Sequence, residues 1–367
     1  MRLVQLRRAA SNPMTPPGAL ASVTGTVDLV DRTSRQVRYL RISLLDRCNY
    51  RCTYCMPDEP MEFGAREEVL RLEEVVSLAA AFARWGVQRV RLTGGEPTLR
   101  RGLVDLVGSL ARLDAHTPSG LRPLEVVMTT NAERLAPMAA PLRQAGLRGL
   151  TISIDSLVPE RFARITRRGN LHNVLSGIDA ANAAGYEHLK LNTVAIKGFN
   201  DDELAELAMF AWSKGMTPRF IEQMPMSGGA TFVPGEMMSA AQVRDAVARV
   251  VGSELVADDG QGVRGHGPAS YWRVASGPWA GYRLGTIGAL TENFCGTCNR
   301  LRVSATGQLH GCLARDETGD LRAALRGGRC GEVERVVKRV LATKRDAHAF
   351  GLDGHGGPRK AMMSIGG

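Results

Sequence analysis

The chain has 367 residues, with 44% hydrophobic and 23% charged residues, which is the composition of a soluble globular protein. No stretch approaches the roughly 20 apolar residues of a membrane-spanning helix, so a membrane-embedded helical protein is excluded. The formal net charge is +10, yet the 47 Lys and Arg are spread along the chain and aromatic residues make up only 5%. This balance suits a polyanionic small molecule as well as it suits nucleic acid.

The first 35 residues contain basic side chains but no apolar run of signal-peptide length after them. We predict a flexible N-terminal extension over residues 1–35, with a short targeting arm as the alternative. Without a secretory signal, the seven cysteines are expected in a reducing compartment, the cytoplasm. Closely spaced thiols in such a compartment indicate metal ligands rather than disulfides.

Between residues 36 and 255, short apolar stretches alternate with amphipathic ones. The predicted strands are residues 37–45, 87–93, 124–130, 149–155, 189–196 and 218–224, and predicted helices include residues 71–86, 136–146 and 201–215. Short connections between such repeats predict parallel strands with right-handed crossovers. Because no G-x-G-x-x-G motif opens a helix, we predict an α/β fold with a partial (β/α)6 TIM-type barrel rather than a Rossmann sheet.

Several polar motifs stand at the carboxyl ends of these predicted strands, where barrels carry their chemistry. They are the first cysteines, TGGEP (93–97), TTN (129–131), SIDS (153–156) and EQMP (222–225). Residues 256–367 are predicted to form a smaller C-terminal region, which contains a second cysteine set, an Arg-rich strand and a Gly-rich end.

Three cysteines follow the first predicted strand as Cys48-x3-Cys52-x2-Cys55. A structural zinc site normally has four protein ligands, and no histidine lies close in sequence to supply the fourth. Three thiolates are enough to hold three irons of a cubane iron–sulfur cluster, whose usual complement is four cysteines. The spacing therefore predicts a cluster with one iron open to a ligand that is not protein.

A second trio, Cys295-x2-Cys298-x13-Cys312, is also one ligand short. His310 could complete a zinc site there, and this alternative stays open. Cys330 is a seventh cysteine that neither trio needs.

Two arginines lie between Cys298 and Cys312. If this segment is a strand, Arg300 and Arg302 share one face because side chains alternate along a strand. Forked guanidinium groups suit phosphate oxygens, so the pair indicates a phosphate site, with a solvated basic strand as the alternative.

The first trio, with an aromatic residue before its last cysteine, resembles the radical S-adenosylmethionine (SAM) superfamily. The resemblance implies that Cys48, Cys52 and Cys55 hold a [4Fe-4S] cluster whose open iron is chelated by SAM, and that Tyr54 contacts the adenine. TGGEP is similar to the glycine-rich element of that superfamily, and the resemblance implies that Gly95 meets the methionine end of SAM.

The two trios, the C-x2-C-x-R-x-R run and the terminal SIGG together resemble the GTP 3′,8-cyclase family, known as molybdenum cofactor biosynthesis protein A, over residues 36–367. The resemblance implies two [4Fe-4S] clusters, SAM as a cofactor and GTP as the substrate. It implies a lyase in which a 5′-deoxyadenosyl radical takes the ribose 3′ hydrogen. The product would be (8S)-3′,8-cyclo-7,8-dihydroguanosine 5′-triphosphate, in the first step of molybdenum cofactor (molybdopterin) biosynthesis.

The resemblance also implies roles for single residues and for the chain end. The implied GTP contacts are Arg41, Arg91, Thr129, Lys190, Arg219, Arg300 and Arg302, and further implied SAM contacts are Ser153 and Met224. The second cluster, held by Cys295, Cys298 and Cys312, would bind the guanine edge at its open iron. Gly366 and Gly367 would form a tail that reaches into the active site.

Taken singly, these residues have ordinary structural alternatives. Lys190 and Arg219 could be surface charges at strand edges. Met224 could fill the core, and Ser153 could cap a turn. The neighbouring threonine could make the contact assigned to Thr129.

The resemblance implies partners as well. An electron donor such as flavodoxin or ferredoxin would supply electrons, and the next enzyme, cyclic pyranopterin monophosphate synthase, would take the product. Neither nucleic acid nor a membrane is expected as a partner. The sequence leaves open the oligomeric state, a homodimer included, and the roles of the extension and of Cys330.

Overall fold

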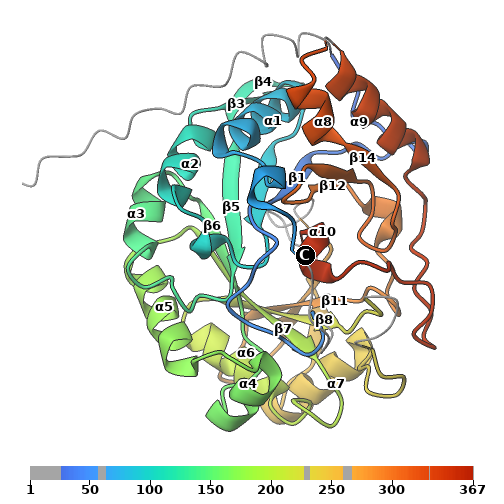
Figure 1. Ribbon diagram of the computed structural model, residues 1–367. Coiled ribbons are helices and arrows are strands. Elements are labelled where there is room, and N and C mark those ends of the chain that lie inside the picture. Colours follow the sequence, from blue (N-terminus) through green and yellow to red (C-terminus); the bar gives the residue numbers. More distant parts are fainter. Residues whose placement is uncertain (1–25, 57–62, 227–231, 259–266, 330, 367) are drawn as a thin grey trace, which may run out of the picture.

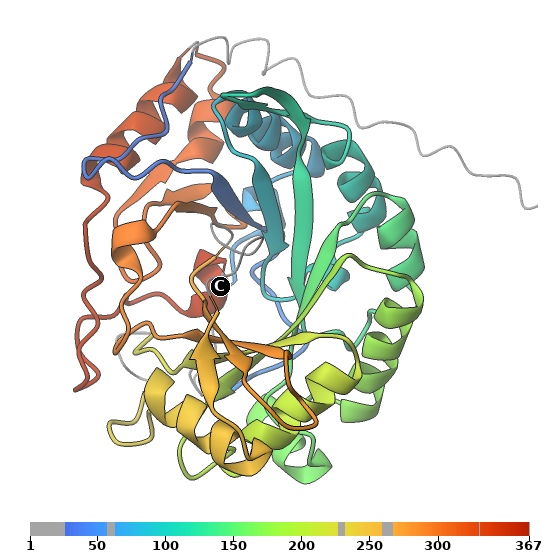
Figure 2. The same cartoon turned by 180° about the vertical axis from the view of Figure 1, so that it is seen from behind.

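The structure is a computed structural model that describes residues 26–56, 63–226, 232–258, 267–329 and 331–366. Its centre is a 12-stranded sheet with the strand order β14-β13-β12-β1-β2-β5-β6-β7-β8-β11-β10-β9. The sheet curves into a partial barrel with helices on its outer side (Figures 1 and 2). This arrangement confirms the predicted α/β class.

Six neighbouring parallel strands form the wall of the barrel, and each coincides with one predicted strand. They are β1 (Tyr39–Ser43), β2 (Arg89–Thr93), β5 (Glu125–Thr130), β6 (Gly149–Ser153), β7 (His188–Ala195) and β8 (Thr217–Glu222). The helices that follow them are α1 (Leu72–Arg84), α2 (Leu103–Leu110), α3 (Ala139–Gln144), α4 (Pro159–Thr166), α5 (Leu171–Ala183), α6 (Leu204–Ser213) and α7 (Ala240–Val251). A separate hairpin, β3 (Asp114–Thr117) and β4 (Gly120–Pro123), was not predicted.

The C-terminal part of the chain extends the sheet at both edges of the six-stranded wall. Strand β12 (Arg300–Val303) pairs in parallel with β1, and β11 (Arg283–Ile287) pairs in parallel with β8. The remaining elements are β9 (Leu255–Ala257), β10 (Ser270–Val274), β13 (Gln308–His310), β14 (Thr318–Asp320), α8 (Leu321–Arg326), α9 (Glu332–Thr343) and α10 (Met362–Ile365). The C-terminal region is therefore continuous with the barrel sheet.

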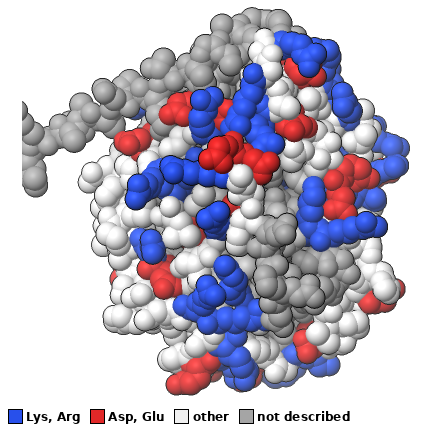
Figure 3. All heavy atoms as spheres, viewed as in Figure 1, with Lys and Arg blue, Asp and Glu red and all other residues white. Residues whose placement is uncertain are grey.

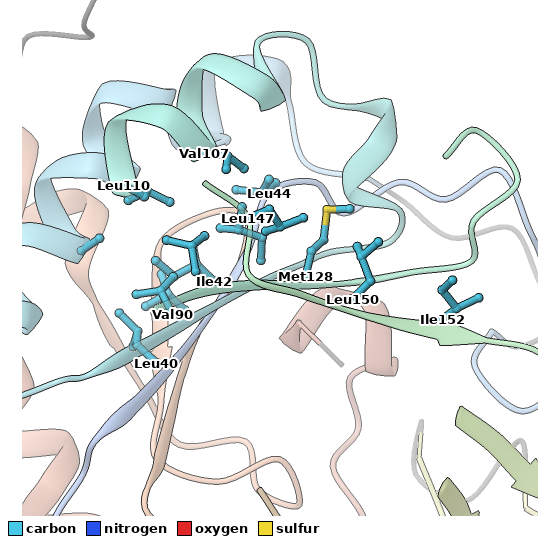
Figure 4. Close-up of a cluster of buried hydrophobic side chains, with 14 of the residues drawn as sticks. Leu40, Ile42, Leu44, Val90, Val107, Leu110, Met128, Leu147, Leu150 and Ile152 are labelled. Carbon is cyan, nitrogen blue, oxygen red and sulfur yellow. The ribbon is translucent and has the colours of Figure 1, made fainter. Parts of the chain in front are cut away.

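Alternation along the strands separates the core from the barrel interior. Leu40, Ile42 and Val90 are fully buried and point toward the helices, in the direction of Val107 and Leu110 on α2 (Figure 4). Because side chains alternate along a strand, the residues between them face the interior. In β1 and β2 these interior residues include Arg41, Arg89 and Arg91, so the outer layer is apolar and the inner layer carries positive charge.

The end of the predicted N-terminal extension is packed in the structure. Val27 and Leu29 are buried in the main core, and Arg35 forms a buried ion pair with Asp31 at 2.7 Å. Residues 1–25 lie outside the described residues. Among the helices of the described ranges, none is both long and apolar enough to cross a membrane.

Candidate active site

A cavity opens at the carboxyl ends of the barrel strands and collects most of the predicted site residues. Those that line it are Arg41, Cys48, Cys52, Tyr54, Cys55, Arg91, Gly95, Thr129, Ser153, Arg219, Met224, Arg300 and Arg302. They come from six strands and the loops after them, so strand ends that are far apart in the sequence form one site in space.

The first cysteine loop follows β1 and packs against the end of α4. The backbone N–H groups of Arg51 and Thr53 donate to Thr166 and Ile165, at 3.0 and 3.1 Å. Within the loop, the Cys55 N–H donates to the Cys52 carbonyl at 3.0 Å. Cys48, Cys52 and Cys55 are free thiols that all line the cavity.

Burial, together with nearby carboxylates, shifts the pKa values of these three thiols. Burial raises the pKa of Cys48 to about 12 and that of Cys55 to about 11. Burial, followed by the charge of Asp155, also raises the pKa of Cys52. A group that must be a thiolate to bind iron is therefore protonated in the metal-free chain, so binding of iron releases protons here.

The TGGEP segment is packed directly on this loop. The Gly95 N–H donates to the Leu45 carbonyl at 2.7 Å, and the Glu96 N–H donates to the Arg47 carbonyl at 3.0 Å. A Cβ on Gly95 would lie 2.1 Å from the Arg47 carbonyl oxygen. The resemblance implied that this glycine allows a close approach of SAM, whereas in the structure the close approach of the cysteine loop already requires it.

Two buried carboxylates beside the cavity were not singled out in the sequence. Glu96 accepts hydrogen bonds from the Thr130 hydroxyl at 2.7 Å and from the Asn131 N–H at 2.8 Å. Asp155 accepts from the Tyr54 hydroxyl at 2.9 Å, and burial raises its pKa to about 6. Both lie inside motifs already quoted, TGGEP and SIDS, so their place at strand ends was the available signal.

The hydrogen bonds of Thr129 and Thr130 differ. The Thr130 hydroxyl is occupied by Glu96 and by the Ala132 N–H, which donates to it at 3.0 Å. The Thr129 side chain faces the cavity and accepts from Arg91 Nη1 at 2.9 Å.

Strand register brings three arginines side by side at one level of the barrel. Arg41 on β1 is paired with Arg302 on β12 and with Arg91 on β2. Neighbouring strands are about 4.8 Å apart, so these guanidinium groups repel one another unless an anion lies between them. Burial and the other arginines lower the pKa of Arg41, and its buried Nε has no hydrogen-bond partner in the described structure. The site therefore has a buried donor and surplus positive charge directed at an anion.

Arg219 and Lys190 are interior residues of the barrel rather than surface charges. Arg219 is 6% exposed and donates to Asn192 at 2.9 Å and to Thr151 at 3.2 Å. Lys190 is half-buried near Tyr271 and lies two residues before Asn192, which lines the cavity. Burial, with the charges of Arg219 and Arg91, lowers the pKa of Lys190 to about 7.

The chain end enters the same region. Arg302 Nη1 donates to the Gly366 carbonyl at 2.7 Å, and Met362 and Met363 line the cavity. Gly366 has φ +79°, and a Cβ there would lie 3.1 Å from the Ser43 side chain. Gly367 and Cys330 lie outside the described residues.

The second cysteine trio lies beside the cavity rather than in its lining. Its neighbours Phe294 and Arg300 line the cavity, and the guanidinium group of Arg300 lies 4.9 Å from the Phe294 ring centre. Arg300 Nη2 donates to Cys298 Sγ at 3.5 Å. Burial raises the pKa of Cys298, but Arg300 and Lys344 outweigh burial and bring it to about 6.

The geometry does not support the zinc alternative at this trio. Across the described ranges, no three His, Cys, Asp or Glu side chains converge closely enough to hold one metal ion. Burial and nearby cations lower the pKa of His310 to about 4, so its imidazole is neutral, which by itself does not speak against a metal. Thiolates of a cubane cluster bind separate irons and do not meet at one point, so the spacing of the thiols is compatible with a cluster at either trio.

Comparisons with known proteins match this geometry. Residues 42–211 match the Radical SAM superfamily, and residues 216–350 match Molybdenum Cofactor Synthesis C. A GTP 3′,8-cyclase of Pseudomonas syringae pv. syringae (strain B728a) is 43% identical over 328 residues, 89% of this chain and 94% of that protein. The chain belongs to the GTP 3′,8-cyclase family. The GTP 3′,8-cyclase of Marinobacter nauticus (strain ATCC 700491 / DSM 11845 / VT8) is 41% identical over 343 residues, 92% of this chain and 98% of that protein.

Solved structures confirm the fold expected of a GTP 3′,8-cyclase family member. Streptococcus suis SuiB bound to precursor peptide SuiA has a TM-score of 0.57 at 14% identity, over 88% of this chain and 71% of that one. SuiB bound to S-adenosylmethionine has a TM-score of 0.57 at 13% identity, over 84% and 64% of the two chains. The fold is thus the α/β radical SAM fold, and membership of that superfamily implies SAM and a [4Fe-4S] cluster.

Proposed function

We propose that this protein is a GTP 3′,8-cyclase. It would convert GTP to (8S)-3′,8-cyclo-7,8-dihydroguanosine 5′-triphosphate, in the first step of molybdenum cofactor biosynthesis. The observation that carries the proposal is the joint position of two incomplete cysteine trios at one arginine-lined cavity. Cys48, Cys52 and Cys55 line this cavity, and the second trio borders it through Arg300.

On the SAM side, Cys48, Cys52 and Cys55 would hold the first [4Fe-4S] cluster. When bound and reduced, that cluster supplies the electron that cleaves SAM to methionine and a 5′-deoxyadenosyl radical. Tyr54, Gly95, Ser153 and Met224 would position SAM, and all four line the cavity together with the cysteines. The protein would bind, orient and exclude water, because the cofactors carry the difficult chemistry.

On the GTP side, the surplus of buried cations provides the binding energy. Arg41, Arg91 and Arg302 lie side by side, and the buried Nε of Arg41 has no hydrogen-bond acceptor among the described residues. Arg219, Lys190, Thr129 and Arg300 would contribute the remaining contacts. Guanidinium groups in this arrangement suit the triphosphate, since each can bind phosphate oxygens in a fork.

At the substrate edge, Cys295, Cys298 and Cys312 would hold a second [4Fe-4S] cluster whose open iron binds the guanine. The Gly366–Gly367 tail would complete the pocket, supported by the hydrogen bond from Arg302 to the Gly366 carbonyl at 2.7 Å. An electron donor of the flavodoxin or ferredoxin kind and the enzyme that consumes the product remain predicted partners. A homodimer also remains a prediction.

The direct test is a reaction with deuterated substrate. Reconstituted protein is incubated without oxygen with SAM, a strong reductant and GTP that carries deuterium at C3′. We expect 5′-deoxyadenosine containing the deuterium, together with a cyclised nucleotide of the stated composition. Unlabelled 5′-deoxyadenosine without any cyclised nucleotide would overturn the assignment to GTP and leave only radical SAM chemistry.

A further inference from the structure

The loop that carries Cys295 and Cys298 is held locally by a small number of hydrogen bonds, from the Cys295 N–H to Asn293 Oδ1 at 2.6 Å and from the Thr297 N–H and hydroxyl to the Phe294 carbonyl, both at 3.3 Å. It forms one turn of 3-10 helix over Cys295–Thr297, closed by the Cys298 N–H, which donates to the Cys295 carbonyl at 3.1 Å. Gly296 and Thr297 are exposed. Two thiolates that must keep fixed positions therefore depend on contacts from elsewhere in the chain.

Arg35 supplies the first such contact, from the N-terminal segment before β1. Its Nη1 donates to the Cys295 carbonyl at 2.7 Å, and its Nη2 donates to the Arg345 carbonyl at 2.7 Å. The same Nη1 also donates to the Asp346 carbonyl at 3.3 Å. The Nε of Arg35 pairs with Asp31 at 2.7 Å, which fixes the guanidinium plane. A guanidinium fork held this way ties the Cys295 loop to the turn after α9.

Lys344, at the end of α9, supplies the second contact. This lysine is only 3% exposed, although burial of an ammonium group is costly without a partner. Its Nζ donates to the Cys298 carbonyl at 3.2 Å, to the Arg300 carbonyl at 3.0 Å and to Cys298 Sγ at 3.6 Å. Every described acceptor of this ammonium thus belongs to the cysteine loop or to the first residue of β12.

We propose that Arg35 and Lys344 form a clamp of positioning residues that fixes Cys295 and Cys298 for the second cluster, with the Lys344 ammonium raising the reduction potential of that cluster. The proposal rests on the proposed function, because it presupposes a cluster at this trio. Hydrogen bonds and positive charge at a cluster sulfur stabilise the reduced, more negative state, which is the physical reason for the expected sign.

The potential is tested in a chain that retains only the second cluster, with Cys48, Cys52 and Cys55 replaced by Ala. In this background Lys344→Gln removes the charge and keeps a hydrogen-bonding side chain. Lys338→Gln, on the exposed side of the same helix, is the matched control. We expect Lys344→Gln to lower the equilibrium constant for reduction about tenfold, which is about 59 mV for one electron, in a titration followed by electron paramagnetic resonance. Equal potentials in the two variants would overturn the role of Lys344.

The position of Cys295 is tested in the otherwise unaltered chain. Arg35→Ala should lose iron from the second cluster several times faster under a chelator, while the first cluster stays. Arg32→Ala, exposed in the same segment, should behave as wild type. Arg35→Lys retains the charge but not the forked hydrogen bonds, so its rate of iron loss should lie between those of Arg35→Ala and Arg32→Ala. If Arg35→Ala does not fold, Arg35→Lys replaces it in the comparison. Equal iron loss from both clusters, or none, would overturn the clamp.

The two levels of the proposal fail in different ways. A wild-type chain that takes up only one cluster would defeat the proposed function itself. A wild-type chain with two clusters, in which Lys344→Gln matches Lys338→Gln and Arg35→Ala matches Arg32→Ala, would defeat only the clamp.

Discussion

The two cysteine trios have the same number of thiols but opposite surroundings. At the first trio, burial and the carboxylates of Glu96 and Asp155 keep the thiol pKa values high, about 12 for Cys48. At the second, burial raises the pKa of Cys295, but Arg300 and Lys344 bring that of Cys298 down to about 6 despite burial. Nearby charge shifts cluster potentials in the same sense, so a cluster at the first trio should be the stronger reductant. This difference suits one site to cleaving a cofactor and the other to holding a substrate.

Removing one cysteine from either trio should have the largest effect, and the effect should differ between the two trios. We expect Cys52→Ala to abolish formation of 5′-deoxyadenosine, whereas Cys312→Ala should still form it but make no cyclised nucleotide. Each variant should lose about four irons per chain, the content of one cubane cluster. Iron analysis and chromatography of the nucleosides measure both effects. Loss of all iron in either variant would mean that the two sites are not independent.

The arginines at the second trio should separate substrate binding from cluster binding. Arg302 contacts the tail and not a cysteine, so Arg302→Ala should weaken GTP binding and leave the iron content unchanged. A hydrogen bond to a charged group contributes about 1.5–3 kcal/mol, so the dissociation constant should rise about 10- to 100-fold. Equilibrium binding of GTP to the reconstituted protein measures this change.

Two companion variants make that result specific. Arg300 donates to Cys298 Sγ, so Arg300→Ala should also change the spectrum of the second cluster. Arg273→Ala, an exposed arginine of β10, should bind GTP as wild type does. Unaltered GTP binding in Arg302→Ala would remove this arginine from the proposed triphosphate site.

Lys190, a proposed contact of the triphosphate, should make the affinity for GTP depend on pH. Its pKa of about 7 lies below the usual lysine value because of burial and the charges of Arg219 and Arg91. A bound triphosphate favours the protonated form, so affinity is highest below pH 7 and falls as pH rises through it. The dissociation constant should rise about fivefold between pH 7 and pH 8.

The control is Lys190→Arg, which stays charged over this range. Titration of GTP itself affects both proteins equally, so the difference between them isolates the lysine. Identical pH profiles for wild type and Lys190→Arg would contradict the assignment.

The smallest expected effect concerns the chain end, where Gly366 accepts a hydrogen bond from Arg302 and lies close to Ser43. Gly366→Ala adds a Cβ close to Ser43 at a φ of +79°, so it should displace the tail and lower the turnover rate several-fold. Gly328→Ala has a similar φ of +65° but open space around it. Both variants have a left-handed backbone cost of about 1–2 kcal/mol. Equal turnover in the two would show that the close contact at Gly366 has no role.

Much of the fold could be predicted because its signals are local. The six barrel strands are short apolar stretches that alternate with amphipathic helical ones. Arg41 and Arg91 came from the family resemblance, and in the structure both line the cavity. The pairing of β12 with β1 could not be predicted, because Arg300 and Tyr39 become neighbours across a long stretch of chain. For the same reason, residues 36–255 and 256–367 remain a predicted division, although their strands share one sheet.

The candidate site divides in the same way. Spacing selected the cysteines as candidate cluster ligands, and the family resemblance selected Gly95 and Thr129; the structure brings all of them to one cavity except the second trio, which lies beside it. Lys344 and Arg35 had no signal, because an isolated lysine or arginine acquires meaning only from the carbonyls that the fold brings to it. The charge of the surface does not indicate the site either. On the visible part of the face in Figure 3, basic residues form separate groups with acidic residues between them.

The central claim is that each trio holds a cluster with its own open iron and its own ligand. Electron paramagnetic resonance of the reduced Cys52→Ala and Cys312→Ala proteins, each titrated with SAM and with GTP, tests it directly. We predict that GTP changes the spectrum only in Cys52→Ala and that SAM changes it only in Cys312→Ala. A spectrum of the second cluster that does not respond to GTP, or that responds to SAM instead, would contradict the account.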